Sequence, residues 1–276
     1  MRVRSVNIGD GDVLLVPGDL HFDAHDPAAV ALMLRVARAF RVNTVALVGD
    51  TFESAGVSRH GRPGRKFRFG HGTVRAEREA AEPYLSAMEA MVLHNRGAPG
   101  GLHVLTGNHE AWWAGVQDEY PGLEDTPWFE LYDDLFDGWH VHAEYTALRF
   151  GPLLVCHGHR LRGSLSKYSA AAVLANYPGQ NTIYGHTHRV DSCITPSYRF
   201  GSPVLHGAWG IGHLKDPVEE MKETYHGGLA ERHRQGFALV FFHEVDHELR
   251  FQVEQAVIDR APGGAVYCIV GGVLFS

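Results

Sequence analysis

Five short apolar runs end in clusters of Asp, Asn and His, and this pattern constrains the fold of the chain more than any other feature. The runs and the clusters after them are 13–16 before Gly18-Asp19-Leu20-His21, 44–48 before Gly49-Asp50, 102–105 before Gly107-Asn108-His109, 153–156 before His157-Gly158-His159, and 182–184 before Gly185-His186-Thr187-His188. Short apolar runs bounded by turn residues are typical of buried strands.

Helix-like segments at 27–40, 77–94 and 164–175 separate these runs. Asp26 followed by Pro27 predicts the start of the first helix, because Asp caps helices and proline suits the first helical position. The resulting β-α-β-α rhythm predicts an α/β fold. In such sheets ligands bind beyond the carboxyl ends of the strands, so we expect the five clusters to converge on one edge of the sheet.

The converging side chains would offer carboxylate, amide and imidazole donors without thiolate. Such a set suits manganese, iron or zinc and disfavours a structural cysteine-zinc site. Each residue also has a simpler interpretation. Asp19 and Asp50 could cap turns, and His157 and His186 could be core histidines. Among the histidines after the last cluster, His206 or His213 could approach the site.

The composition of the chain argues against several classes of protein. The 276 residues are 45% hydrophobic and carry a net charge of −7, which argues against a globally basic nucleic-acid binder. No apolar run reaches the ~18 residues of a membrane helix, so we expect no membrane partner. The nearest candidate, 265–275, is broken by Gly271 and Gly272 and is predicted to be a buried strand. Three widely spaced cysteines predict a reducing, cytoplasmic location.

We expect a single domain over residues 1–276. Segments 51–76 and 111–138 are predicted to be long and irregular, and the chain is predicted to be rich in strands from about residue 190. There, 237–242 and 249–257 predict a hairpin around Asp246-His247-Glu248.

The five clusters, written Asp-X-His, Gly-Asp-X-X-Glu, Gly-Asn-His-Glu, His-Gly-His and Gly-His-Thr-His, together resemble the calcineurin-like metallophosphoesterase superfamily over roughly residues 13–190. Any one motif is common, but five in this order are specific. The later segment, with Trp209 and 235–237, resembles small phage- and prophage-type members. The resemblance implies an α/β fold of two packed mixed β-sheets flanked by helices.

The resemblance also implies two divalent metal ions with a hydroxide between them. Manganese is expected, with iron, zinc, nickel or cobalt as alternatives. One ion would be held by Asp19, His21 and His188, the other by Asn108, His157 and His186, with Asp50 bridging both. His109 matches the catalytic histidine that protonates the leaving oxygen. Glu53 stands where relatives place a partner for it, and would orient His109.

The segment 51–76 is strongly basic, with Arg59, Arg62, Arg65, Lys66, Arg68 and Arg75 and one acid, Glu53. It is either a solvated basic loop or an electropositive lid that recruits a phosphorylated or polyanionic substrate. On the second interpretation Arg62, Arg65, Lys66 and Arg68 bind substrate. His159 would either contact substrate, or be a surface residue or a residue that supports a metal ligand.

These features favour a two-metal phosphodiesterase acting on nucleic acid or nucleotides. The alternatives are a phosphomonoesterase for protein or small-molecule substrates, a dinucleoside polyphosphate hydrolase, and an inactive interaction module that keeps the fold. The last is disfavoured because every expected ligand type and His109 are present.

Overall fold

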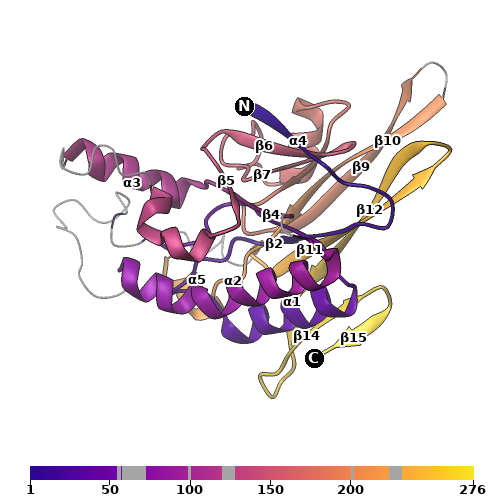
Figure 1. Cartoon of the computed structure of the whole chain (residues 1–276). Coiled ribbons are helices and arrows are strands. Elements are labelled where there is room, and N and C mark those ends of the chain that lie inside the picture. The colour runs from indigo at the N-terminus through magenta and orange to yellow at the C-terminus, as the bar shows by residue number, and fades with distance from the viewer. Residues whose placement is uncertain (55–56, 58–72, 99–100, 120–127, 200–201, 224–231) are drawn as a thin grey trace.

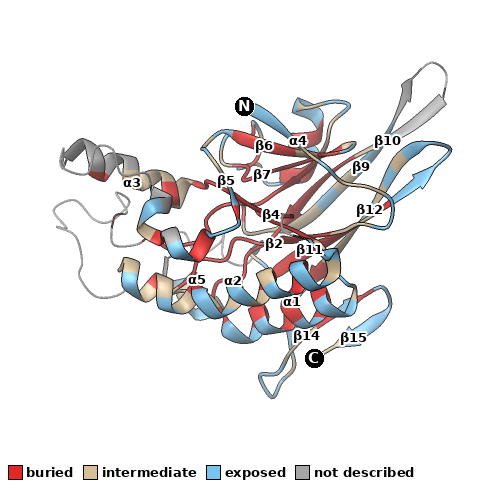
Figure 2. Ribbon diagram, in the orientation of Figure 1, coloured by how far each residue is buried: buried red, intermediate tan, exposed pale blue. Residues whose placement is uncertain are grey.

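Two mixed β-sheets pack face to face with helices outside them, which confirms the predicted fold class (Figure 1). The computed structural model describes residues 1–54, 57, 73–98, 101–119, 128–199, 202–223 and 232–276. Buried residues gather in the central strands and on the inner faces of the helices (Figure 2). Among the helices of the described residues, none combines the length and apolar character needed to span a bilayer.

One six-stranded sheet holds the strands before the last two polar clusters. Its order is β1 (Arg2–Val6), β6 (Thr146–Phe150), β7 (Leu153–Cys156), β8 (Asn181–Tyr184), β10 (Ser202–Ile211) and β9 (Val190–Arg199). β7 and β8 pair in parallel, whereas β10 and β9 form an antiparallel hairpin.

The other six-stranded sheet holds the strands before the first three clusters. Its order is β12 (Glu248–Val257), β11 (Gly236–Val245), β2 (Val13–Pro17), β3 (Thr44–Leu47), β4 (Leu102–Leu105) and β5 (His140–His142). β2, β3 and β4 pair in parallel, so their carboxyl ends share one edge. β11 and β12 form the predicted hairpin, which turns at Asp246 and His247, both with positive φ.

Three apolar clusters define the layers. Leu14, Val16 and Val48 of one sheet pack against residues such as Val155 and Ile183 of the other, and this cluster holds the sheets together. The outer face of the β2–β4 sheet packs on α1 (Pro27–Ala39) and α2 (Val74–Arg96). The outer face of the other sheet packs on α4 (Ser169–Asn176). Apolar burial between layers is the main favourable term in a fold of this kind.

Helix α1 begins as the sequence predicts. The Asp26 carboxylate accepts hydrogen bonds from the N–H groups of Ala28 and Ala29, and Pro27 is the first helical residue. Buried residues at 29, 30, 33, 36 and 37 then recur at helical spacing on the face toward the sheet. Helix α4 starts only at Ser169, later than the predicted 164, and residues 161–167 form turns instead.

The structure corrects two further sequence predictions, at 111–138 and 265–275. Within 111–138, predicted to be irregular, α3 (Asn108–Glu119) and the 3₁₀ segment η3 (Trp128–Phe136) are present, and Tyr132 and Phe136 of η3 are buried. The run 265–275 is not one buried strand. β14 (Val266–Val270) and β15 (Val273–Phe275) form a hairpin that turns at Gly271 and Gly272.

That hairpin is largely exposed because only one of its faces meets the protein. It forms a three-stranded sheet with β13 (Asp259–Arg260) and packs Cys268, Val270 and Phe275 into the cluster on the α1 side. The short helix α5 (Pro217–Glu223) lies between β10 and β11 in the chain.

Candidate metal centre

The five polar clusters come together from both sheets. β2, β3 and β4 belong to one sheet and β7 and β8 to the other, so the centre forms between two sheets and not on one edge of a single sheet. The His186 N–H after β8 donates to Asp19 Oδ2 after β2, at 2.6 Å. His157 Nε2 after β7 lies 3.2 Å from Asp50 Oδ2 after β3.

Glycines in the motifs permit this close approach. A Cβ atom on Gly107 would lie 2.2 Å from Asp50 Oδ1, and a Cβ on Gly185 would lie 2.2 Å from Asp19 Oδ1. Four predicted ligands also adopt positive φ, which is uncommon for residues with side chains. They are His21 at 50°, Asp50 at 47°, His186 at 65° and His188 at 54°. Such conformations concentrate at functional sites, where surrounding contacts maintain them.

The first group of donor atoms comprises Asp19, His21 and His188, each placing one ligand atom within 4.8 Å of the others. The two imidazoles point their Nε2 atoms at each other, 3.1 Å apart, and His188 Nε2 lies 3.5 Å from Asp19 Oδ2. All three predicted ligands of one ion therefore face a common point.

A carboxylate lies on the Nδ1 side of each imidazole. His188 Nδ1 donates to Glu220 Oε1 at 2.7 Å, and the same oxygen accepts from His233 Nδ1 at 2.5 Å. His21 Nδ1 lies 2.8 Å from Glu53 Oε2, close but outside hydrogen-bond geometry. A carboxylate at Nδ1 leaves the Nε2 lone pair free, as in metal-bound histidines generally.

The second group comprises Asp50, His157 and His186, whose ligand atoms also lie within 4.8 Å of one another. Asn108 joins it, because its Oδ1 lies 2.9 Å from His157 Nε2. The structure thus brings all seven predicted ligands into two neighbouring groups, with Asp50 in the second, and its bridging of both ions stays a prediction.

Electrostatics show how strongly these groups depend on one another. Burial raises the pKa of Asp19 to about 7. Burial alone would lower the pKa of His157, but the Asp50 and Asp19 charges raise it to about 9. Burial and neighbouring His157 lower the pKa of His186 to about 3.

Three ligand-residue atoms of the centre have no hydrogen-bond partner among the described residues, namely Asp19 Oδ1, His21 Nδ1 and His157 Nδ1, and all three are buried. A buried carboxylate oxygen without a partner is unfavourable unless a cation or donor meets it. The orphaned oxygen and the oxygen-plus-imidazole donor set therefore fit divalent metal ions.

His109 lies beside both groups. Its N–H donates to Asp50 Oδ1 at 2.9 Å, and its Nδ1 donates to the main-chain carbonyl of Glu53 at 2.6 Å. Nε2 lies 3.9 Å from Asp50 Oδ2, and the ring stacks on Trp112 with centroids 4.0 Å apart. The fixed Nδ1 proton leaves Nε2 as the atom directed toward the centre.

Glu53 differs from its predicted role. It orients His109 through its main-chain carbonyl, whereas its carboxylate contacts His21 and the buried Lys215, whose Nζ lies 3.0 Å away. The reason is geometric: the backbone after β3 brings the carbonyl, not the side chain, against the ring. The carboxylate therefore supports a predicted metal ligand.

Glu110 is a supporting residue whose importance the motif only suggested. Its two carboxylate oxygens accept four main-chain N–H groups, from Asp50, Thr51, Phe52 and Gly107, at 2.7–3.1 Å. Burial and the charge of Asp50 raise its pKa, while the four donors favour its ionised form. Glu110 ties the loop after β3 to the loop after β4.

Other supporting residues follow the last motif. Lys215, Glu220 and His233 carried no sequence signal. His213 was one of two histidines considered as able to approach the site, and its ring centroid lies 4.9 Å from that of His188. His159 lies at the edge of the second group, with ring centroids 5.1 Å from His157, and its Nε2 contacts Glu144 Oε1 at 3.1 Å. Arg62, Arg65, Lys66 and Arg68 lie outside the described residues.

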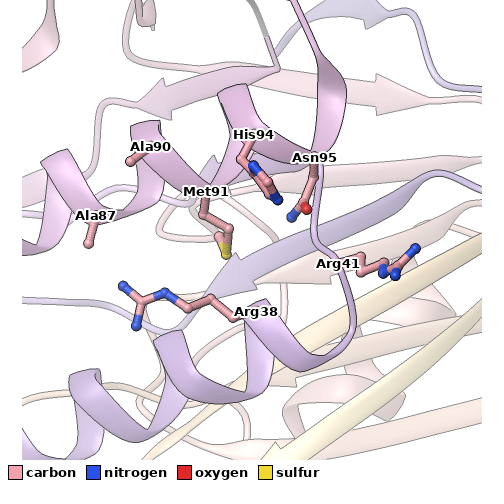
Figure 3. Close-up of a pocket in the computed structure, with 7 residues that line it drawn as sticks. All are labelled: Arg38, Arg41, Ala87, Ala90, Met91, His94 and Asn95. Carbon is pink, nitrogen blue, oxygen red and sulfur yellow. The ribbon is translucent and has the colours of Figure 1, made fainter.

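Two cavities of the described part lie outside the centre. The larger, about 450 Å³, is lined by the ends of α1 and α2 where β3 begins, so it lies at the opposite edge of the sheet. Figure 3 shows Arg38 and Arg41 there, extending in different directions. The smaller, about 320 Å³, is lined by the start of β9 and the residues around the start of α4.

Comparisons with known proteins give distant structural likeness only. No family model matches the chain, and no curated protein matches it. Vacuolar protein sorting 29 from Cryptosporidium parvum is 14% identical, with 97% of this chain and 99% of that chain covered and a TM-score of 0.45. Vps29 from Chaetomium thermophilum is 10% identical, with 96% and 97% covered and a TM-score of 0.44. Yfce, a phosphoesterase from E. coli, is 14% identical, with 87% and 98% covered and a TM-score of 0.38.

Proposed function

We propose that the chain is a two-metal-dependent phosphoester hydrolase, and more narrowly a phosphodiesterase acting on nucleotides or nucleic acid. One observation carries the proposal: seven oxygen and imidazole donors from five strand ends converge in two groups, with His109 beside both. The order of the motifs, which resembles that of calcineurin-like metallophosphoesterases, supports the same reaction. Mn²⁺ is the proposed ion, and Fe, Zn, Ni and Co fit the same donors.

Asp19, His21 and His188 would hold one ion, Asn108, His157 and His186 the other, and Asp50 both. When bound, two such ions supply Lewis acidity that activates water and stabilises both the attacking and leaving oxygens of an in-line displacement. Glu220 accepts the Nδ1–H of His188 and keeps its Nε2 on the centre, and the Glu53 carboxylate lies 2.8 Å from Nδ1 of His21. Glu110 maintains the spacing of the loops that carry Asp50 and Asn108.

His109 is the residue proposed to move a proton. The Glu53 carbonyl holds its Nδ1–H, so the exchangeable proton resides on Nε2. From there His109 donates to the leaving oxygen, and the stack on Trp112 limits rotation of the ring. General acid catalysis of this kind contributes roughly 10²–10⁴-fold to rate.

The test is hydrolysis of bis(p-nitrophenyl) phosphate and of p-nitrophenyl phosphate by chelated and Mn²⁺-reloaded protein. We expect activity only after reloading, with the higher kcat/KM for the diester. The His109→Ala variant should lose most of this activity. His247→Ala, which changes a fully exposed histidine, is the control and should keep it. Turnover that survives chelation, or none with either ester, would contradict the proposal. Preference for the monoester would favour the phosphomonoesterase alternative.

A further inference from the structure

The smaller cavity is rich in positive charge, and two of its lining residues are sequence neighbours of residues at the metal centre. Lys167, Arg189 and Arg232 line it. Arg189 directly follows the predicted ligand His188, and Arg232 directly precedes His233, which shares the Glu220 oxygen with His188. The backbones of two of the three cations are therefore adjacent to residues of the centre.

Among the described residues that line this cavity, three cations stand against one carboxylate. Asp191 is the acidic residue that lines it, and its oxygens accept from Ser169 Oγ at 2.6 Å, Ala170 N–H at 3.0 Å and Tyr184 OH at 3.0 Å. No described carboxylate forms an ion pair with the three cations.

A neutral carbonyl group, and not a carboxylate, holds the Arg189 side chain in place. It donates from one terminal nitrogen to the Ser166 carbonyl at 2.5 Å, and its buried Nε has no hydrogen-bond partner among the described residues. In a chain of net charge −7, this grouping is a local site of attraction for anions.

Tyr168 adds an aromatic surface to the same cavity. Its side chain is exposed, and Lys167 Nζ lies 5.3 Å from the centre of its ring. Exposed aromatic rings beside cationic side chains are the usual platform for a nucleobase whose phosphate is bound alongside. The larger cavity in Figure 3 has two arginines and one imidazole, His94, but no Tyr, Phe or Trp in its lining, and those arginines do not converge.

We propose that this cavity binds the nucleotide unit next to the scissile phosphodiester. Its phosphate contacts Lys167, Arg189 and Arg232, and its base stacks on Tyr168. This inference rests on the proposed phosphodiesterase function and narrows its substrate class to diesters that carry a second phosphate and a base.

The kinetic test uses a dithymidine dinucleotide without a terminal phosphate, and the same dinucleotide with a phosphate at the 5′ or the 3′ end. For the wild type with Mn²⁺, we expect one of the two phosphorylated dinucleotides to have a kcat/KM about tenfold higher than the unphosphorylated one. The gain should come mainly from a lower KM, and its size is that of two or three exposed charge contacts. In Lys167→Ala/Arg232→Ala this ratio should fall toward one. Arg38→Ala/Arg41→Ala removes the same charge at the larger cavity and should keep the ratio.

Direct binding provides a second, independent readout. AMP is titrated by calorimetry into chelated protein, so that metal ions cannot hold its phosphate. We expect Lys167→Ala/Arg232→Ala and Tyr168→Ala each to weaken AMP binding several-fold, and Arg38→Ala/Arg41→Ala to leave it unchanged. The inference would be overturned if all variants bound AMP with equal affinity. It would also be overturned if Lys167→Ala/Arg232→Ala and Arg38→Ala/Arg41→Ala weakened AMP binding equally. If the wild type hydrolyses no diester, the proposed function fails, and the AMP titration still decides whether the cavity is a nucleotide site.

Discussion

Replacing Glu110 by glutamine should destabilise the protein far more than its similar shape suggests. Oε1 accepts N–H groups of Thr51 and Phe52, and Oε2 accepts those of Asp50 and Gly107. A glutamine amide has one acceptor oxygen, so either orientation turns an NH₂ group toward two N–H donors. Two hydrogen bonds to a charged group are lost, each contributing about 1.5–3 kcal/mol. The expected loss in free energy of unfolding is therefore about 3–6 kcal/mol.

Urea unfolding of chelated protein, followed by tryptophan fluorescence, measures this loss as a lower midpoint at unchanged slope. Glu79→Gln is the matched control, because that carboxylate is 65% exposed and pairs with Arg75 on the surface. The control should change stability by about 0.5 kcal/mol or less. A Glu110→Gln protein within about 1 kcal/mol of the wild type would refute the reasoning, since four buried donors could then lose half their acceptors without consequence.

Three other changes test separate parts of the site. Glu220→Gln should weaken one Mn²⁺ site about tenfold by calorimetry, because His188 loses the carboxylate that orients it; an unchanged affinity would contradict that role. His109→Ala should keep both metal ions and lower kcat about 10²–10⁴-fold, more for alkoxide than aryl leaving groups; equal losses would exclude a general acid. Burial raises the pKa of Glu77 from 4.5 to about 8, so the folded state holds a proton that the unfolded state releases. Its contribution to stability should be complete below the unfolded pKa and decline as pH rises toward 8, and Glu77→Gln should remove that dependence in unfolding experiments.

The sequence predicted the parts of the site that local signals specify. Asp19 and Asp50 each follow an apolar strand and a glycine, and that arrangement alone placed them at strand ends. It could not reveal that β2 and β7 lie in different sheets, because strand order depends on pairing between distant segments. Convergence was therefore expected on one sheet edge and was found between two.

The supporting residues were harder to predict, because packing between distant segments decides them. Glu220 lies on a seven-residue helix 32 positions after His188 and belongs to no motif. Lys215 lies near Glu53 where two β-bridges, Asp19 with His213 and His25 with Lys215, bring distant segments together. Residues 108–119 lack an apolar stripe, so helix α3 gave no periodic signal although it begins within a motif at Asn108.

The central claim is that these side chains hold two metal ions, and anomalous diffraction from a Mn²⁺-soaked crystal tests it most directly. Two peaks are predicted: one among Asp19, His21 and His188, the other among Asn108, His157 and His186, with Asp50 in contact with both. Crystals of Asp50→Asn should show weaker density at both positions, since one carboxylate serves both ions. A wild-type crystal with no anomalous density among these residues, or with manganese bound elsewhere, would contradict the account.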